Sequence, residues 1–431
     1  MEESLIKKKC TRASVFLIFA SLFLYVAVTS ATGLYTAEKT TLYTLGKFGN
    51  LTNLATTLEL YYYTYAAMQI FLIFFIRKVN IKWFLTLTLA SSAVLIASVS
   101  VTNGINQHYL IYAVNGVFQA GTWGCLLKML SVHIPSRLLP LANQVISAGP
   151  ALSGGASYTV AAAFGENWKT SFLFMGLFLF FATLLYFVSV TRIERLPKEA
   201  EALPLSDTGT VDECGNDFIN LKNKKRIVVF YAVSMLMGFL FTSLYFMVKN
   251  NLDVFLKEIG GFTNSTSKLL AIFAPIFAAI GPFLAVRSCE KRKNFITVAA
   301  LYFGAALIFA TLLVFLFASH VALSLSLAVL FMVFVNGGWS VTLSIASLRM
   351  RGRIDTGIYS SLVNSVSSVA SGIAPKFITA FLDDTSYTTR DSWQASFLSV
   401  FLLNLAVVAI LLSLILVVRL LNKKDREALV Q

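Results

Sequence analysis

Charged residues are scarce in this chain of 431 residues. Asp, Glu, Lys and Arg make up 13% of it, about half of the roughly 25% that is usual in soluble proteins. So few charges cannot cover the surface of a soluble protein of this length. Because 57% of the residues are hydrophobic, a disordered chain is excluded as well. The composition therefore predicts a protein that crosses a membrane several times.

The residue types that hold metals or form disulfides are also few. The chain has three histidines and four scattered cysteines, at His108, His133, His320, Cys10, Cys125, Cys214 and Cys289. No CxxC pair or metal-ligand spacing occurs among them. There is no GxxxxGK[ST] phosphate loop and no pattern of a nucleophilic triad. We therefore expect no metal, no cofactor, no ATP coupling and no enzymatic activity.

The chain does have long apolar runs. Each is about 20–27 residues long, against the ~20 that a helix needs to cross the hydrocarbon core. The first run is too long for the core of a cleaved signal peptide and is interpreted as an uncleaved helix. Twelve membrane-spanning helices are predicted, at residues 14–34, 53–76, 81–102, 109–131, 138–163, 169–190, 227–248, 268–287, 294–318, 321–346, 358–381 and 394–420.

Positive charge is unevenly distributed between the loops. The 35 Lys and Arg outnumber the 21 Asp and Glu, and most of them fall in the loops on the same side as the two termini. Cytoplasmic loops are the ones that carry excess Lys and Arg. We therefore predict cytoplasmic termini, with Arg77, Cys214, Arg292 and Arg353 on the same side, and a location in the plasma membrane. The basic excess then reflects topology, and no nucleic-acid partner is expected.

The chain contains an internal repeat. Val114-Asn115-Gly116 recurs as Val335-Asn336-Gly337, and Pro150 corresponds to Pro375 at nearly the same offset. A third match places Trp168-Lys169-Thr170-Ser171-Phe172-Leu173 before one helix and Trp393-Gln394-Ala395-Ser396-Phe397-Leu398 before another. The repeat predicts a six-helix half at 1–190, a cytoplasmic linker at 191–226 and a second half at 227–431. Parallel six-helix repeats around a midplane site are typical of transporters.

Short motifs extend this pattern over essentially the whole chain. They are Gly116-Val117-Phe118-Gln119, Trp123, Lys128, Ser153-Gly154-Gly155, Asp253-Val254-Phe255-Leu256-Lys257-Glu258 and the segments at Trp168 and Trp393. With them the chain resembles the major facilitator superfamily. Within it, the chain is most similar to the organophosphate:phosphate antiporters and anion:cation symporters. The resemblance implies an all-α fold of twelve helices and alternating access to a central site.

The residues with which that branch holds phosphate are missing. The antiporters use one arginine on the first helix and one on the seventh, and these positions correspond to Val28 or Thr29 and to Tyr245 here. The histidine of their fifth helix corresponds to Ala151. A pair of guanidinium forks is well suited to a phosphate dianion, so a different solute is expected.

Two charged residues inside predicted helices are candidates for function, because an intramembrane charge is costly. Glu59 is interpreted either as a carboxylate for proton coupling or cation pairing, or as a helix-start residue reached by water. Lys376 lies where the repeat places Ala151, so it is a candidate counter-ion for an anionic solute. The alternative is a lysine that extends toward the outer surface near Asp383 and Asp384.

Three further basic residues lie near helix ends. Lys128 and Arg349 are equivalent under the repeat, and we expect them to neutralise helix C-termini and to help close an inner gate. Lys249, near the outer end of the seventh helix, is either an interface anchor or a substrate-binding residue.

Uncharged polar and aromatic residues complete the predicted substrate site. Asn115, Gln119 and Trp123 share one helical face because they are four residues apart. For each of these residues, helix–helix packing is the alternative. The full candidate set besides Lys376 and Lys249 is Tyr25, Thr29, Tyr35, Asn115, Gln119, Trp123, Tyr245, Asn336 and Trp339.

The predicted function is secondary transport of a small anionic or zwitterionic organic solute, as symport or antiport, by a monomer. A proton or a counter-anion is the expected coupling partner. The alternatives are a transporter-like sensor of an external solute and an exporter of hydrophobic compounds. The sequons at Asn50 and Asn264 fall in predicted outside loops and matter only in a secretory setting.

Overall fold

The computed structural model describes residues 2–75, 78–135, 138, 142, 145, 146, 148–195, 224–291, 295–341 and 356–430. These residues form helices joined by short connections, and none of them lies in a strand. The all-α membrane fold predicted from the apolar runs is confirmed. Of the predicted linker, residues 196–223 lie outside the described part of the chain, as do Arg77, Cys214, Arg292, Arg349 and Arg353.

We call helices α1 to α8 the N half. Its elements are α1 (Glu2–Thr44), α2 (Leu51–Phe75), α3 (Ile81–Ser98), the 3-10 turn η1 (Val99–Val101), α4 (Ile105–Gln119), α5 (Thr122–His133), α7 (Gly149–Phe164) and α8 (Trp168–Glu194).

We call helices α9 to α18 the C half. Its elements are α9 (Lys224–Lys249), α10 (Leu252–Glu258), α11 (Asn264–Ala271), α12 (Phe273–Ala278), α13 (Ile280–Lys291), α14 (Phe295–Leu316), α15 (Val321–Ser340), α17 (Thr356–Leu382) and α18 (Thr389–Val430).

Ten helical segments of the described residues are long and apolar enough to cross a membrane. Helices α2 and α7 raise the number to the predicted twelve. Helix α2 is less apolar because Glu59 and a run of tyrosines occupy its middle, and only 16 residues of α7 belong to the described part.

Three differences from the predicted helix boundaries bear on the candidate site. Helix α1 continues ten residues beyond the predicted end at 34, to Thr44. The seventh span continues past Lys249 through α10 and runs over Val228–Glu258. The fourth predicted span is divided into α4 and α5 at Ala120 and Gly121. The first two differences place charged residues inside spans that the sequence analysis had assigned to loops.

Side-chain caps begin several of these helices. The Asn80 side chain accepts a hydrogen bond from the Trp83 N–H at the start of α3, and Asn167 does the same for Thr170 in α8. Thr263 caps α11. Such caps satisfy backbone donors that have no partner within the helix. They therefore fix where the chain turns back into the bundle.

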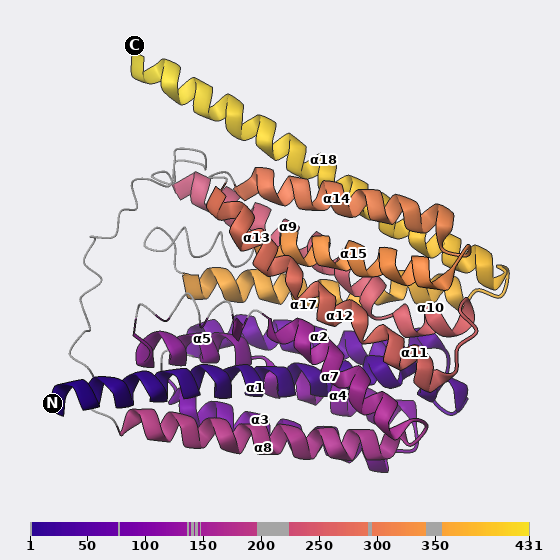
Figure 1. The fold of residues 1–431 in the computed structure, drawn as a ribbon, viewed down its shortest axis with the longest axis horizontal. Coiled ribbons are helices and arrows are strands. Elements are labelled where there is room, and N and C mark those ends of the chain that lie inside the picture. The colour runs from indigo at the N-terminus through magenta and orange to yellow at the C-terminus, as the bar shows by residue number, and fades with distance from the viewer. Residues whose placement is uncertain are drawn as a thin grey trace.

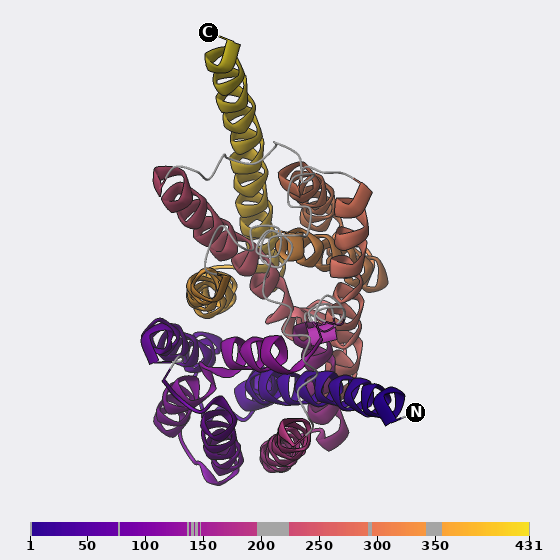
Figure 2. The same cartoon turned by 90° about the vertical axis from the view of Figure 1, so that its left-hand side faces the viewer.

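The two halves lie side by side, with the N half in indigo to magenta and the C half in pink to yellow (Figures 1 and 2). Both chain termini lie toward one end of the bundle, which we call the termini end (Figure 1). The opposite end, where α10 and α11 lie, is called the distal end. The halves meet along α2 and α17, and along α7 with α11 and α12.

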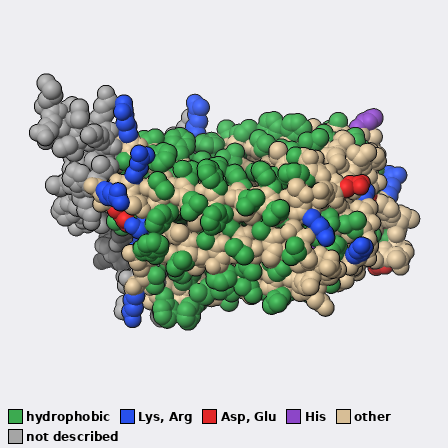
Figure 3. Space-filling view, turned by 90° about the horizontal axis from the view of Figure 1, so that it is seen from below, with side chains coloured by type: hydrophobic (Ala, Val, Ile, Leu, Met, Phe, Trp, Pro, Cys, Tyr) green, Lys and Arg blue, Asp and Glu red, His purple; other side chains and the backbone are tan. Residues whose placement is uncertain are grey.

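The surface between the two ends is apolar. In the view of Figure 3, hydrophobic side chains cover the middle of the molecule and Lys and Arg gather toward its ends. Large apolar side chains on this belt are more than half exposed, which suits contact with lipid rather than with water. Among them are Phe74, Leu87, Leu110, Phe181, Phe315 and Leu402.

Candidate functional site

Glu59 and Lys376, which the sequence analysis singled out separately, form an ion pair between α2 and α17. The pair therefore joins the N half to the C half. The Tyr63 hydroxyl also donates to Glu59 Oε1 at 2.5 Å. The side chains are 13% and 29% exposed for Glu59 and Lys376 respectively. An intramembrane carboxylate and an intramembrane lysine thus neutralise each other without being fully enclosed by the protein.

The close contact of α2 and α17 at this pair depends on Gly372. A Cβ at this position would lie 3.1 Å from the Cα of Glu59 and 3.3 Å from the Cβ of Tyr62. One end of the same contact is fixed by Asp383, whose carboxylate accepts from the Leu51 and Thr52 N–H groups at 3.2 and 2.8 Å. Asp383 therefore caps α2, a role distinct from the partner of Lys376 considered in the sequence analysis.

Lys249 is the last residue of α9, and the seventh span continues beyond it through α10 to Glu258. Its Nζ stands 5.0 Å from the Phe246 ring centroid and 5.9 Å from that of Tyr245. Its Cε would lie 3.4 Å from a Cβ at Gly154 on α7. The side chain therefore lies at the boundary between the halves.

Aromatic side chains of the candidate set lie on the N half beside this boundary. The Tyr25 and Trp123 rings are tilted against each other with centroids 5.1 Å apart. Both side chains, and Tyr245 on α9, are partly exposed. Thr29 binds the Tyr25 carbonyl with its hydroxyl at 2.7 Å, an i to i−4 bond within α1.

Three other candidates belong to the buried interior of the N half. Gln119 accepts from Thr32 and Tyr61 at 2.9 and 2.7 Å and donates to Ser92 at 2.8 Å. Asn115 accepts from the same serine at 2.6 Å. This polar network holds α1, α2, α3 and α4 together, which is the packing role that the sequence analysis gave as the alternative.

Tyr35 is likewise fully buried. Its hydroxyl accepts from Thr57 at 3.0 Å and lies 3.1 Å from His108 Nδ1. The ring packs against Tyr112 with centroids 4.8 Å apart. These contacts place Tyr35 in the N-half core.

The remaining candidates lie on α15 and α5. Asn336 donates to the Ala278 carbonyl at 2.8 Å and so ties α15 to α12. Trp339 is partly exposed, and its buried Nε1 has no hydrogen-bond partner among the described residues. Lys128 lies on α5, partly exposed. Its equivalent Arg349 lies outside the described residues.

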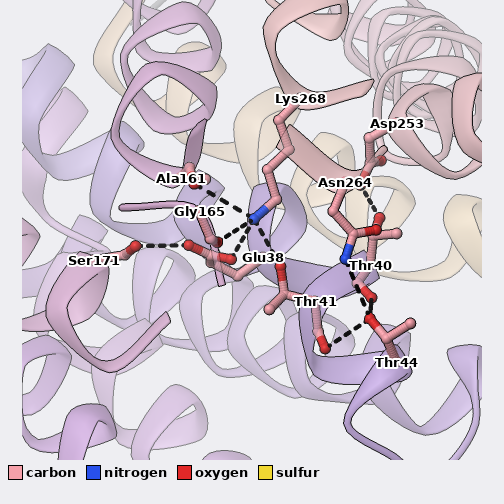
Figure 4. A network of polar contacts seen from close by, with 10 residues as sticks. All are labelled: Glu38, Thr40, Thr41, Thr44, Ala161, Gly165, Ser171, Asp253, Asn264 and Lys268. Carbon is pink, nitrogen blue, oxygen red and sulfur yellow. Dashed lines mark hydrogen bonds and ion pairs between the residues drawn. The ribbon is translucent and has the colours of Figure 1, made fainter. Parts of the chain in front are cut away.

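Sequence reasoning missed a buried ion pair at the distal end. Glu38 on α1 and Lys268 on α11 are 2.6 Å apart, and both side chains are 0% exposed. Glu38 also accepts from Ser171 on α8 at 2.7 Å, and Lys268 donates to Thr41 at 2.7 Å (Figure 4). Lys268 comes from the C half, whereas its partners are all in the N half.

A second group of contacts crosses the same boundary next to this pair. Lys39 donates to the Asn250 carbonyl at 2.6 Å and to Asn251 Oδ1 at 2.7 Å. Thr40 donates to Asp253 on α10, as Figure 4 shows. Together with Glu38 and Lys268 these residues form what we call the distal latch: Glu38, Lys39, Thr40, Thr41, Asn250, Asn251, Asp253 and Lys268.

Glu59, the one carboxylate that the sequence analysis named inside a helix, is not alone in the spans. Glu38 and Asp253 are fully buried in helical spans as well. The signal that could have revealed Glu38 and Lys39 is the lack of Gly and Pro between residues 34 and 44, because nothing there ends a helix. Asp253 was noted only as part of a family motif.

The latch and the central groups differ from a metal or thiol centre. No group of three or more His, Cys, Asp or Glu in the described residues is arranged to hold a metal ion. Cys125 and Cys289 are buried, and neither is part of a disulfide. Of the two sequons, Asn264 donates to Thr44 Oγ1 at 3.4 Å, and Asn50 accepts from the Asn53 N–H at 2.9 Å.

The model of the Major Facilitator Superfamily matches residues 13–375. None of the curated proteins matches the chain in sequence. The likeness to the organophosphate antiporter branch stays a prediction.

Solved structures share the fold at low sequence identity. A bacterial homolog of the human lysosomal transporter Spinster, in an inward-facing and unoccupied conformation, is 12% identical with a TM-score of 0.66; the match covers 96% of this chain and 97% of the homolog. The nucleoside transporter NupG is 15% identical with a TM-score of 0.61, covering 93% of this chain and 98% of NupG. At these identities the likeness shows the fold alone.

Proposed function

The chain belongs to the Major Facilitator Superfamily, and from this premise we propose that it moves a small organic solute across the membrane by alternating access. The observation that carries this proposal is the distal latch. A buried ion pair and its hydrogen bonds connect the two halves at one end of the bundle. Transporters of this organisation work by rocking one half against the other around a fixed site, and a polar latch at one end is a contact that such a motion makes and breaks.

The orientation follows from the charges. Lys and Arg concentrate in loops on the side of the termini, so the termini end is placed in the cytoplasm and the distal latch faces outward. The latch then closes the outer side, and the conformation is inward-facing. The likeness to an inward-facing Spinster homolog supports this assignment. Labelling Cys214, in the predicted linker, with an impermeant thiol reagent tests it: modification in sealed right-side-out vesicles would contradict it.

We assign the coupling role to the Glu59–Lys376 pair. It lies between the halves on α2 and α17 and is partly exposed, so a proton can reach it. Protonation of Glu59 removes the charge that Lys376 neutralises and frees the lysine. Binding of a proton and movement of the two halves are thereby linked at one contact, which is what a proton-coupled transporter needs.

A reversible lock of the latch tests the proposal. Thr44 and Asn264 are in hydrogen-bond contact across the halves, so cysteines at both positions, in a background without the four native cysteines, should form a disulfide. Proteoliposomes are assayed for uptake of radiolabelled glutamate, lactate, 4-hydroxybenzoate and uridine under an imposed pH gradient. We expect oxidation to abolish uptake of the accepted solute and a reducing agent to restore it, while each single-cysteine control stays active under oxidation.

The alternatives predict other results. A sensor binds a solute without accumulating it, and an exporter of hydrophobic compounds confers drug tolerance without taking up any of these solutes. Uptake that continues with the disulfide formed, as verified by loss of free thiols, would contradict alternating access through the latch.

A further inference from the structure

Lys249 is the cation that the proposed transport cycle leaves unexplained. It lies within a membrane span, and among the described residues it forms no ion pair and donates no hydrogen bond. Three other lysines in the spans have oxygen partners, since Lys376 and Lys268 pair with carboxylates and Lys39 has two oxygen acceptors. An intramembrane lysine without an anion is costly, so an occupant that supplies a negative charge would be favoured.

The surroundings of Lys249 offer rings and hydrogen-bond donors. The Phe246 and Tyr245 rings lie 5.0 and 5.9 Å from the ammonium, which suits a cation–π contact. Tyr62, from α2 of the other half, packs its ring edge to face with Phe246 at 5.9 Å. The hydroxyls of Tyr62 and Tyr245 bond to no described residue, although both side chains are partly exposed.

The Glu59 carboxylate, which lies close to these rings along α2, is already occupied. Glu59 precedes Tyr62 by three residues on α2, one turn of the helix, and it is paired with Lys376 and bonded to Tyr63. The region therefore presents one unpaired positive charge, free donor hydroxyls and flat apolar faces. It offers no unpaired acceptor charge among the residues that the structure describes.

We propose that Lys249 is the counter-ion of a monoanionic aromatic solute, whose carboxylate binds the ammonium and whose ring packs against the cluster of Tyr62, Tyr245 and Phe246. This inference rests on the proposed transport function and names the substrate class of the same site. It also moves the anion-binding role from Lys376, which has a partner, to Lys249. The single unpaired ammonium is complementary to a solute with one negative charge, and the aromatic rings from both halves are suited to packing against a planar ring.

Gly154 explains how the lysine reaches this place. A Cβ at that position would lie 2.6 Å from Pro275 Cβ and 3.4 Å from Lys249 Cε. The glycine lets α7 approach α12 while the lysine stem passes beside it. Lys249 is thus held between the halves, where a bound anion would contact both.

Binding measurements on the purified full-length protein test the inference. The probes are two carboxylates with their neutral amides, 4-hydroxybenzoate with 4-hydroxybenzamide and indole-3-acetate with indole-3-acetamide, titrated at fixed pH and salt. We expect each carboxylate to bind at least about thirtyfold more tightly than its amide, as removal of one member of a desolvated charge pair would predict. Lys249→Gln should abolish this preference and leave amide binding unchanged, and Lys249→Arg should keep part of it.

Lys169 provides the matched control. Its ammonium also lies over a ring, 5.6 Å from the Trp168 centroid, but its side chain is exposed. Lys169→Gln should keep the full preference for carboxylates, and the melting temperatures of all variants verify folding.

Two results would overturn the inference: equal binding of acid and amide by the wild type, or a preserved preference in folded Lys249→Gln. Neither result affects the proposed transport function, because the disulfide lock tests it by uptake, with glutamate, lactate and uridine as well as 4-hydroxybenzoate. Conversely, carboxylate binding that depends on Lys249 without uptake into proteoliposomes would contradict transport and leave the anion site standing.

Discussion

The distal latch and the central site use the same residue types in opposite ways. In the latch, Glu38 and Lys268 are both 0% exposed and paired. In the centre, Glu59 and Lys376 are paired but partly exposed, and Lys249 has no charged partner among the described residues. A fully buried and paired charge stabilises one arrangement of the halves, whereas a partly exposed or unpaired charge can exchange its partner. The difference separates a closing contact from a binding contact.

Breaking the latch should have the largest effect on stability. Lys268→Met leaves Glu38 buried without a cation, which costs about 3–5 kcal/mol when one partner of a buried pair is removed. We expect a large fall in melting temperature in detergent, together with greater accessibility of the distal end to thiol reagents at an introduced Thr41→Cys. The double variant Glu38→Gln with Lys268→Met is the control. It should recover most of the loss, because the carboxylate that the single variant leaves unpaired is removed, and a double variant as unstable as the single one would contradict this account.

The central pair should affect transport more than stability. Because Glu59 and Lys376 are partly exposed, we expect Glu59→Gln or Lys376→Gln to cost only about 1 kcal/mol of stability. Glu59→Gln should lose uptake driven by a pH gradient and keep counterflow exchange, since the solute site stays intact.

Unchanged gradient-driven uptake in the folded Glu59→Gln variant would remove Glu59 from the coupling mechanism. Lys376→Gln serves as the comparison with Lys249→Gln. It should leave the preference for aromatic carboxylates in place, because Lys376 already has a carboxylate partner.

Hydropathy predicted the helices well because an apolar run of about 20 residues has few other stable conformations in a membrane. Hydropathy could not predict where the helices begin and end. The segment after residue 34 contains Glu38, Lys39 and several threonines, which look like a loop until α11 supplies Lys268 as a partner. Likewise, Glu59 and Lys376 were recognised one by one, but their pairing depends on how α2 packs against α17. Long-range contacts of this kind leave no local signal in one sequence.

The cap at the edge of the interface should have a moderate effect. Asp383 from the C half accepts hydrogen bonds from the first N–H groups of α2 in the N half, so it is an N-cap supplied by another segment. Asp383→Ala should cost about 0.5–2 kcal/mol, as for other caps, measured by thermal unfolding. Asp391→Ala is a suitable control, because Asp391 bonds only locally to Thr388 in the described contacts. Equal losses in the two variants would argue against an interface role for Asp383.

The smallest effect should come from an ion pair that, like Glu38–Lys268, joins a lysine ammonium to a glutamate carboxylate at nearly the same distance. Lys82 and Glu194 are 2.5 Å apart, yet their side chains are 15% and 36% exposed, and both belong to the N half. Water stabilises each charge when the other is removed, so Lys82→Met should cost no more than about 1 kcal/mol and leave uptake unchanged. Added salt should reduce even this cost, because exposed pairs are screened, while the cost of Lys268→Met stays the same. A similar loss for Lys82→Met and Lys268→Met would mean that burial does not distinguish the latch from an ordinary surface pair, and the assignment of the latch as the closing contact would then lose its physical basis.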